Sequence, residues 1–287
     1  MNPKKNPPPQ DMLSRFAYNL AFFAGCGLAL PWLVVQAAAT RKHRRVFRQR
    51  LGFHRSSLPA GSLHRPIWIH ALSVGEVLSA TVIVKAVRKR FPHKNIVFSA
   101  STATGIETAR RTLKEFTDQI FFFPYDLLFS VKKVMTTVRP DFIILVETDI
   151  WPNFLWETQC RGIPVFLVNA RLSDKTFSRF CAIREFMGPL LSIFSGIFTQ
   201  SAIDTKRFRA VGVSPQNLHT AGNLKFDQPL QGTPPPAVIS EWVQRHRGGG
   251  KFIWTAGSTH EGEESILAET LRLLDKQKVE VALMVAP

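Results

Sequence analysis

The hydrophobic and polar positions of this chain form alternating blocks, with short apolar runs between longer amphipathic segments. From Pro66 onward the short runs are rich in β-branched and aromatic residues, which is typical of buried strands. Five of these runs predict strands: Ile67–Ala71, Asn95–Ala100, Phe142–Val146, Val165–Val168 and Gly196–Thr199. Strands that alternate with helices in this way predict an α/β fold built on a parallel sheet.

The longer segments have the apolar spacing of helices that pack on a sheet. They predict helices over Val77–Arg90, Thr104–Glu115, Leu127–Val138, Trp151–Arg161, Lys175–Leu191 and Ala202–Val211. Polar turns follow all five strands, and the carboxyl ends of parallel strands meet at one edge, where ligands bind. We therefore expect SVGE, STATG, ETDIWP, NARLS and QS to converge on one cleft.

A break in the pattern follows residue 227 and divides the chain. The proline-rich QPLQGTPPPAV predicts a semi-rigid linker over residues 228–250. The βα pattern then restarts with KFIWTAGST, a helix over Glu261–Gln277 and the strand VEVALMVAP. These features predict an N-terminal domain over residues 51–227 and the beginning of a second one over 251–287. Because one βαβ unit cannot cover both faces of its sheet, we expect a piece of a longer protein or a reduced second half.

The first 50 residues have a different character. Tyr18–Ala39 contains no charged residue and is long enough to cross a hydrocarbon core of about 30 Å. Pro31 keeps an anchor lying in the membrane plane open as an alternative. Arg41–Arg50 follows with six Lys or Arg, which favours the cytoplasmic side and anionic lipid. We expect residues 1–50 to anchor the chain, by a spanning or monotopic segment, on the cytoplasmic face of the inner membrane. A cleaved signal peptide is the competing interpretation, although its apolar region is usually shorter.

Composition adds a preference for anionic partners. The chain has 37 Lys and Arg against 21 Asp and Glu, a net charge of +16 that suits nucleic acid, anionic membrane or phosphorylated substrates. The apolar segment beside the basic cluster favours the membrane, and we expect no nucleic acid partner. The three cysteines lack metal-ligand or CxxC spacing and predict reduced thiols and no metal cofactor. Motifs for nucleotide hydrolysis, dinucleotide binding, serine hydrolysis and zinc proteolysis are absent from the sequence.

Two carboxylates close predicted strands at the expected cleft. Glu76 opens a helix after the first strand, where it is either a catalytic group or a charge that favours the helix dipole. Glu147 ends the apolar run DFIILVE, where it either shares the site with Glu76 or pairs with a basic residue. Two neighbouring carboxylates raise each other's proton affinity, as a general base near neutral pH requires. In the turn before Glu76, Ser73 and Gly75 are predicted to contact substrate, because Gly75 permits close approach.

Basic and hydroxyl side chains complete the candidate site. Arg171, Arg207 and Lys225 lie in or beside polar turns, where they would bind phosphate or carboxylate unless they are solvated surface charges. In GSTHEGEE, the turn Ser258–His260, which includes Thr259, presents hydroxyl and N–H groups before a helix, and Glu263 follows in that helix. This arrangement predicts either a phosphate site at the donor or an ordinary capping box.

The motifs taken together resemble those of the 3-deoxy-D-manno-octulosonic acid (Kdo) transferases of lipid A biosynthesis. The resemblance runs from about Phe16 to the end of the chain through HALSVGE, FFPYD, RPDFIILVETDIWPN, PVFLVNARLS, TQSAIDTKRF, VGNLKFD and GSTHEGEE, in the order of the family. It implies a GT-B fold of two Rossmann-like domains, with the lipid acceptor mainly on the first and CMP-Kdo mainly on the second.

The resemblance also implies an activity and residue roles. The family transfers Kdo from CMP-Kdo to a hydroxyl of the lipid A precursor (lipid IVA) with inversion and without a nucleotide-bound metal. By motif match Glu76 takes the place of the general base, and Glu147 that of a second acidic residue. Asp149 departs from the usual ETELWP pattern. The family also continues past VALMVAP into an Arg-His-Pro-Glu-Arg segment, so a non-catalytic lipid-binding homologue, or a GT-B transferase with another nucleotide sugar, remains an alternative.

Overall fold

A computed structural model describes residues 13–22, 24, 41–53, 65–227, 235–248 and 251–286. The chain divides into two compact units, Met1–Gln228 and Pro229–Pro287, each described here by itself. The predicted anchor over Tyr18–Ala39 lies for the most part outside the described residues. Among the residues that are described, no helix has the length and apolar character needed to cross a membrane.

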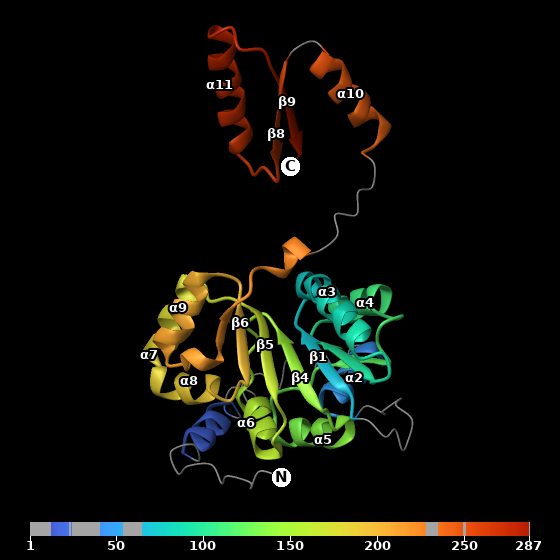
Figure 1. Cartoon of the computed structure of the whole chain (residues 1–287), viewed down its shortest axis with the longest axis vertical. Helices are drawn as coiled ribbons and strands as arrows, with labels where there is room; N and C mark the ends of the chain where they lie inside the picture. Colours follow the sequence, from blue (N-terminus) through green and yellow to red (C-terminus); the bar gives the residue numbers. More distant parts are fainter. Residues whose placement is uncertain are drawn as a thin grey trace. The chain divides into compact units, whose positions relative to one another are not determined.

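The first unit is built on a seven-stranded parallel sheet with the order β3-β2-β1-β4-β5-β6-β7 (Figure 1). The strands are β1 (Ile67–Ala71), β2 (Ile96–Ala100), β3 (Gln119–Phe122), β4 (Phe142–Val146), β5 (Val165–Ala170), β6 (Gly196–Thr199) and β7 (Leu218–Thr220). The predicted α/β class and the five predicted strands are confirmed. The sequence analysis missed β3 and β7, the two strands at the sheet edges, because each is a short run with a neighbour on one side only.

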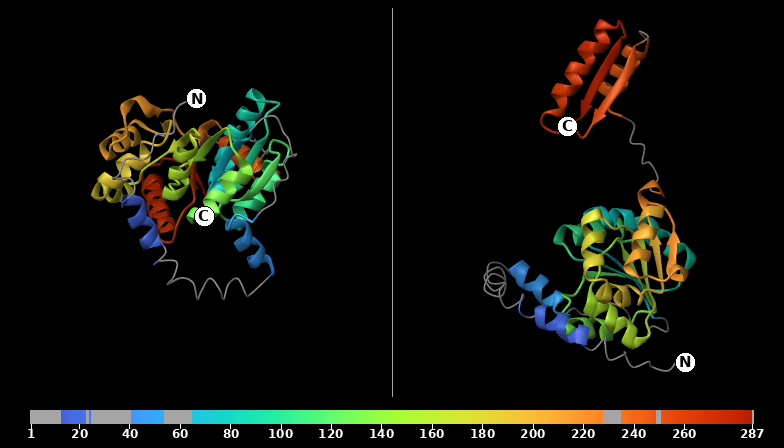
Figure 2. Two further views of the ribbon diagram at one scale, coloured as in Figure 1. Left: turned by 90° about the horizontal axis from the view of Figure 1, so that it is seen from below. Right: turned by 90° about the vertical axis from the view of Figure 1, so that its left-hand side faces the viewer.

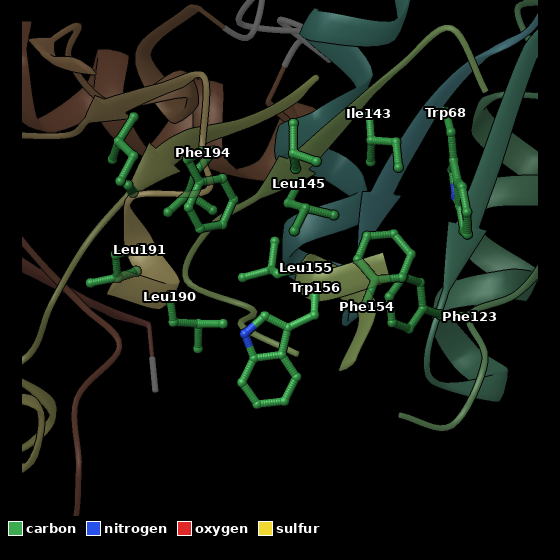
Figure 3. Close-up of a cluster of buried hydrophobic side chains, with 14 of the residues drawn as sticks. Trp68, Phe123, Ile143, Leu145, Phe154, Leu155, Trp156, Leu190, Leu191 and Phe194 are labelled. Carbon is green, nitrogen blue, oxygen red and sulfur yellow. The ribbon is translucent and has the colours of Figure 1, made fainter. Parts of the chain in front are cut away.

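Helices cover both faces of this sheet. The helices α3 (Val74–Arg90) and α4 (Ala103–Thr112) pack on one face through a cluster that includes Val77 and Ile106. The remaining helices and turns of this unit are α2 (Arg41–Arg50), α5 (Leu128–Val138), α6 (Pro152–Arg161), α7 (Asp174–Ala182), α8 (Arg184–Leu191), α9 (Ala202–Val211), η1 (Pro215–Asn217) and η2 (Leu224–Asp227). The helices on the face of the sheet opposite α3 and α4 bury the hydrophobic cluster drawn in Figure 3. In this cluster the rings of Trp68, Phe123 and Phe154 pack against one another.

One predicted helix is divided in two. The sequence predicts a continuous helix over Lys175–Leu191, but the chain breaks at Ile183 (φ −119°, ψ 36°) into α7 and α8. The break lets α7 pack against α9 while α8 packs against α6 and α9. Packing on two different neighbours therefore overrides a local pattern that suits one helix.

A further helix of the first unit, over residues 13–22, packs beside α6 and α8 (Figure 1). The Tyr18 ring packs edge-on against Trp156 and stacks near Phe186, and its hydroxyl donates to Asp126 Oδ2 at 2.8 Å. Asp126 is 1% exposed and also accepts from the backbone N–H groups of Asn153 and Phe154, each at 2.9 Å, so it caps the N-terminus of α6. Burial raises the pKa of Asp126 to about 7.

The second unit contains one parallel βαβ arrangement. The strands β8 (Phe252–Gly257) and β9 (Val281–Ala286) pair in parallel and are connected through α11 (Glu263–Lys276). Helix α10 (Ala237–Gly248) contacts β8, and the two helices flank the strands (Figure 2). About half of the range 228–250 that the sequence predicts as linker is thus helical, since α10 begins after Pro235 and Pro236 and includes EWVQRHR.

Candidate active site

The carboxyl ends of the strands in the first unit border a pocket of about 300 Å³. Its walls come from the turns after β1, β4, β5, β6 and β7: Leu72, Glu76, Glu147, Thr148, Asp149, Arg171, Ser173, Thr176, Gln200, Asn223 and Lys225. The structure thus brings together the predicted residues Glu76, Glu147, Arg171 and Lys225. The STATG turn after β2 contributes no lining residue, because Thr102 Oγ1 instead caps α4 by accepting from Gly105 N at 3.0 Å.

Glu76 lies in the first turn of α3, directly after β1 and the N-cap residue Ser73. Its carboxylate accepts from the backbone N–H of Leu72 at 2.6 Å and from Ser73 Oγ at 3.4 Å. Desolvation raises the pKa of Glu76 to about 7, although the hydrogen bond from the Leu72 N–H acts to lower it. The negative charges of Glu147 and Asp149 raise the pKa further. A side chain with this pKa exchanges protons near neutral pH, as a general base must.

Ser73 and Gly75 lie beside Glu76 but play different parts. Ser73 contributes its hydroxyl to the Glu76 carboxylate. A Cβ atom built on Gly75 meets nothing within 4 Å, so no other backbone approaches it. The space beside Gly75 is therefore open, and its contact with substrate stays a prediction.

Glu147 follows β4 with a left-handed backbone, φ +62°. Such a conformation costs a non-glycine residue about 1–2 kcal/mol. The Glu147 N–H donates to Val168 O at 2.8 Å, which continues the pairing with β5 past the end of β4. The tertiary structure holds this backbone in place and presents the carboxylate to the pocket.

Asn169, near the end of β5, joins three walls of the pocket and was not identified from the sequence. Its Nδ2 lies 3.4 Å from Glu147 Oε1, and its Oδ1 accepts from Leu224 N at 3.1 Å. Its carbonyl accepts from Gln200 Nε2 at 3.0 Å. These bonds hold the turn of η2, and with it Lys225, against the carboxyl edge of the sheet.

The predicted cations fall into two groups. Arg171 and Lys225 line the pocket with exposed side chains and, within the described ranges, form no ion pair. Arg207 instead bonds the Asp174 carboxylate and the Leu172 carbonyl and is absent from the pocket wall. The structure therefore gives Arg207 a clamping role between α9 and the start of α7 and does not place it with the other predicted substrate-binding residues.

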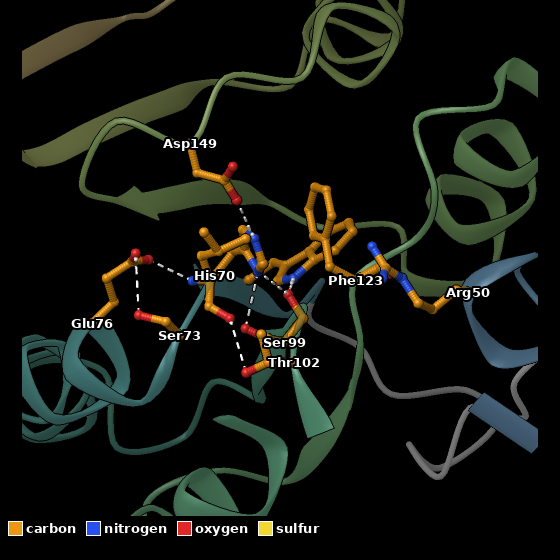
Figure 4. A network of polar contacts seen from close by, with 10 residues as sticks. Arg50, His70, Ser73, Glu76, Ser99, Thr102, Phe123 and Asp149 are labelled. Carbon is orange, nitrogen blue, oxygen red and sulfur yellow. Dashed lines mark hydrogen bonds and ion pairs between the residues drawn. The ribbon is translucent and has the colours of Figure 1, made fainter. Parts of the chain in front are cut away.

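A buried network behind the pocket was also missed (Figure 4). Asp149 Oδ2 lies 2.9 Å from Nε2 of His70, a residue of β1 that is 0% exposed. On the far side, Arg50 donates through Nε to Phe123 O at 3.2 Å, and burial lowers its pKa while the charge of Asp149 partly restores it. The sequence contained one signal that could have revealed this network, the histidine His70 inside the apolar run PIWIHA. A histidine between apolar residues needs a polar partner from elsewhere in the fold.

The turn after β8 belongs to the second unit. Ser258 has a left-handed backbone, φ +58°, and its N–H donates to Ala286 O at 2.7 Å. The His260 N–H donates to Glu263 Oε2 at 2.9 Å, so Glu263 caps the start of α11. Thr259 is largely buried. The N-cap residue of α11 is Gly262, which has no side-chain cap, so the predicted capping box of a Ser or Thr with Glu is not formed. The donor-binding role of this turn stays a prediction.

No metal-binding set is found among the described residues, because none of their His, Cys, Asp and Glu side chains gather in groups of three or more. The pocket instead combines carboxylates with two cations and amide groups.

Comparison with solved structures defines the class. UDP-GlcNAc 2-epimerase from Neisseria meningitidis, bound to UDP-GlcNAc, aligns with a TM-score of 0.52 at 13% identity and covers 77% of this chain and 64% of its own. A 2-epimerase from Methanocaldococcus jannaschii gives a TM-score of 0.50 at 14% identity over 77% of this chain and 66% of its own. At these identities the likeness concerns the fold alone: this is an α/β protein with a GT-B-like fold.

Sequence comparison then defines the family. Residues 45–228 match the family described as 3-Deoxy-D-manno-octulosonic-acid transferase (kdotransferase). The 3-deoxy-D-manno-octulosonic acid transferase of Haemophilus influenzae is 31% identical over 279 residues, which cover 95% of this chain and 63% of that protein. That of Chlamydia trachomatis serovar D is 30% identical over 159 residues, 55% of this chain and 37% of its own. The chain belongs to the Kdo transferase family and spans less than two thirds of the length of these relatives.

Proposed function

We propose that this protein is an inverting glycosyltransferase of lipopolysaccharide biosynthesis that transfers Kdo from CMP-Kdo to the lipid A precursor lipid IVA. The observation that carries the proposal is the position of Glu76, whose pKa is raised to about 7 in a pocket that also contains Arg171 and Lys225. Family membership supports Kdo as the transferred sugar. The pocket supports a reaction between a hydroxyl group and an anionic donor.

Glu76 acts as the general base in this proposal. Its carboxylate takes the proton of the acceptor hydroxyl while the hydroxyl oxygen attacks the anomeric carbon of Kdo. The new glycosidic C–O bond forms as the bond between that carbon and the phosphate oxygen of CMP breaks, so CMP leaves with the bonding electrons. One displacement of this kind inverts the configuration, and Glu76 later releases its proton to water.

The cations of the pocket serve the donor in this proposal. Arg171 and Lys225 attract the carboxylate of Kdo or the phosphate of CMP, both of which are anionic. Glu147 keeps the proton affinity of Glu76 high through its own charge. In the second unit, the turn with Ser258, Thr259 and His260 precedes the N-terminus of α11, where the exposed Ser258 hydroxyl and the positive end of the helix dipole favour a phosphate group.

The protein acts at the cytoplasmic face of the inner membrane in this proposal. The helix over residues 13–22 exposes Leu13, Phe16 and Leu20 by 72%, 68% and 61%, and their spacing places them on one face. The basic residues Arg44 and Arg45 of α2 are also exposed. Exposed apolar side chains and exposed cations both suit an anionic lipid surface, on which the acylated acceptor resides.

The test is transfer by the purified protein from CMP-Kdo to lipid IVA in detergent micelles, followed by mass spectrometry of the lipid. We expect Glu76→Gln to reduce the rate by about 100-fold or more. Glu107→Gln, the same change at an exposed position of α4, is the matched control and should keep the wild-type rate. Full activity of Glu76→Gln would reject the assigned base. Transfer from another nucleotide sugar alone would reject the donor, and lipid binding without transfer would reject the catalytic role.

A further inference from the structure

His70 is a buried histidine that the mechanism above does not use. It lies in β1, opposite Ser99 of β2 and Leu145 of β4. Its ring stacks on Phe123 with the centroids 3.9 Å apart and the planes at 21°. Because the side chain is 0% exposed, the neighbouring strands and Phe123 hold the ring in one orientation.

The contacts of Nδ1 determine where one ring hydrogen lies. Nδ1 is 3.0 Å from the Ser99 carbonyl oxygen and 2.9 Å from Ser99 Oγ. The Trp68 Nε1–H donates to the same Oγ at 2.8 Å. A carbonyl oxygen has no hydrogen to donate, so the contact with Nδ1 is a hydrogen bond only when Nδ1 carries one. Ser99 Oγ can donate to a bare Nδ1, but the Ser99 carbonyl oxygen would then face the Nδ1 lone pair at 3.0 Å, whereas a hydrogen on Nδ1 satisfies both contacts. The two contacts therefore favour a hydrogen on Nδ1 and leave Nε2 to face Asp149.

The contact between Nε2 and Asp149 implies a second hydrogen. Nε2 and Asp149 Oδ2 are 2.9 Å apart, the distance of a hydrogen bond. Two lone pairs at this distance would repel, so a proton lies between the imidazole and the carboxyl group. His70 and Asp149 together then have no net charge, whichever of the two holds that proton.

We propose that His70 is a positioning residue: it fixes the Asp149 carboxyl group at the wall of the Glu76 pocket and, by sharing one proton with it, offsets part of the negative charge that Asp149 places beside Glu76. The inference rests on the proposed role of Glu76 as the base. It assigns to His70 and Asp149 the task of setting the pH at which that base is free to act.

Other charged groups surround the pair and are constant in the comparison that tests it. They come from α2, α3 and the turns after β3, β4, β5 and β7: Arg50, Glu76, Asp126, Glu147, Arg171 and Lys225. Arg50 packs over the Tyr125 ring at 4.1 Å and so is held apart from Glu76, on the other side of the network (Figure 4). A substitution at His70 or Asp149 leaves all of these residues in place, including Asp126, which also titrates near pH 7 and is common to every variant.

The experiment is a pH titration of the Glu76 carboxyl carbon by NMR, in the whole chain with ¹³C-labelled glutamate. The Glu76 signal is assigned by its loss in Glu76→Gln. We expect His70→Gln to raise the titration midpoint by about 0.5–1 pH unit, because Asp149 loses the shared proton and keeps its full charge. Asp149→Asn should lower the midpoint, because it removes the negative member of the pair, which lines the Glu76 pocket, whereas His70 lies behind it. The double variant should titrate like Asp149→Asn.

His93→Gln is the matched control, since it makes the same substitution at an exposed histidine. Circular dichroism and a urea denaturation curve report whether each variant folds. An unchanged midpoint in folded His70→Gln, or shifts of the same sign in His70→Gln and Asp149→Asn, would overturn the proposal.

A second measurement decides the matter if His70→Gln fails to fold. Long-range ¹H–¹⁵N spectra of the wild-type imidazole should show Nδ1 protonated at neutral pH, and an unprotonated Nδ1 would overturn the proposal. These titrations do not depend on transfer activity. Activity that survives in Glu76→Gln therefore rejects the proposed function, whereas an unmoved Glu76 midpoint rejects only the role of His70.

Discussion

The Glu76 carboxylate accepts the backbone N–H of Leu72 at 2.6 Å, while burial beside Glu147 still raises its pKa to about 7. The hydrogen bond favours the ionised form and the desolvation opposes it, and desolvation is the larger of the two. A carboxylate in this balance changes its protonation state within the physiological pH range.

The first prediction concerns stability. Because the pKa of Glu76 in the folded state is raised from 4.5 to about 7, its stabilising contribution is present below pH 4.5 and is lost as the pH rises through about 7. Glu76→Gln does not titrate, so its free energy of unfolding should exceed that of the wild type above pH 7, by about 1–2 kcal/mol after allowance for solvent screening. Urea denaturation at acid and alkaline pH measures this difference. A Gln variant that becomes relatively less stable as pH rises would contradict it.

The second prediction concerns the rate of transfer. If Glu76 is the base, the rate should fall as the pH drops below about 7, since the protonated carboxyl group cannot accept the acceptor proton. Removing the charge of Glu147 with Glu147→Gln should move this fall to lower pH, because that charge raises the pKa of Glu76. Initial rates across the range from about pH 5 to 9 provide the measurement. A rate independent of pH below 7 would argue against Glu76.

The third prediction concerns the docking of residues 13–22. Asp126→Asn places an amide N–H₂ group where a carboxylate oxygen accepts from Tyr18, Asn153 or Phe154, and should lower the free energy of unfolding by about 2–3 kcal/mol. Because the pKa of Asp126 is raised to about 7, the free energy of unfolding of the wild type falls relative to that of Asp126→Asn as the pH rises through that value. The deficit of the variant should therefore narrow with increasing pH.

The control for this site is Tyr18→Phe, which removes one hydroxyl donor and should lower the free energy of unfolding by about 1 kcal/mol. Thermal or urea denaturation measures both variants. A variant Asp126→Asn as stable as the wild type, or a deficit that widens with pH, would show that Asp126 does not hold the segment.

The fourth prediction separates the two kinds of cation. Lys225→Met removes a pocket charge and should raise the KM for the anionic donor by about 10- to 100-fold, with little change in stability. Arg207→Met removes a clamp on Asp174 and Leu172, and should lower the free energy of unfolding by about 1 kcal/mol while KM stays unchanged. Kinetics and denaturation of the two variants side by side test the assignment. A larger KM change for Arg207→Met than for Lys225→Met would reverse it.

The sequence by itself determined the class of the first unit and the position of the first carboxylate. Ile67–Ala71 and Phe142–Val146 are strands over the residues that the pattern predicts, because a strand that is buried on both faces requires a short run of consecutive apolar residues. The same local pattern predicts the position of Glu76, because a strand, a short turn and a helix start place it at the carboxyl edge of the sheet. The motif order also predicted the Kdo transferase family, which the comparisons confirm.

Only the tertiary structure decided which groups meet. His70 and Asp149 are separated by 79 residues, and Arg207 and Asp174 by 33, so no local pattern reveals either pair. The first pair depends on β1 lying beside β4, and the second on α9 packing against α7. Hydrophobic periodicity records which face of an element is buried, whereas the partner of a polar side chain depends on sheet order and helix packing, which bring distant segments together.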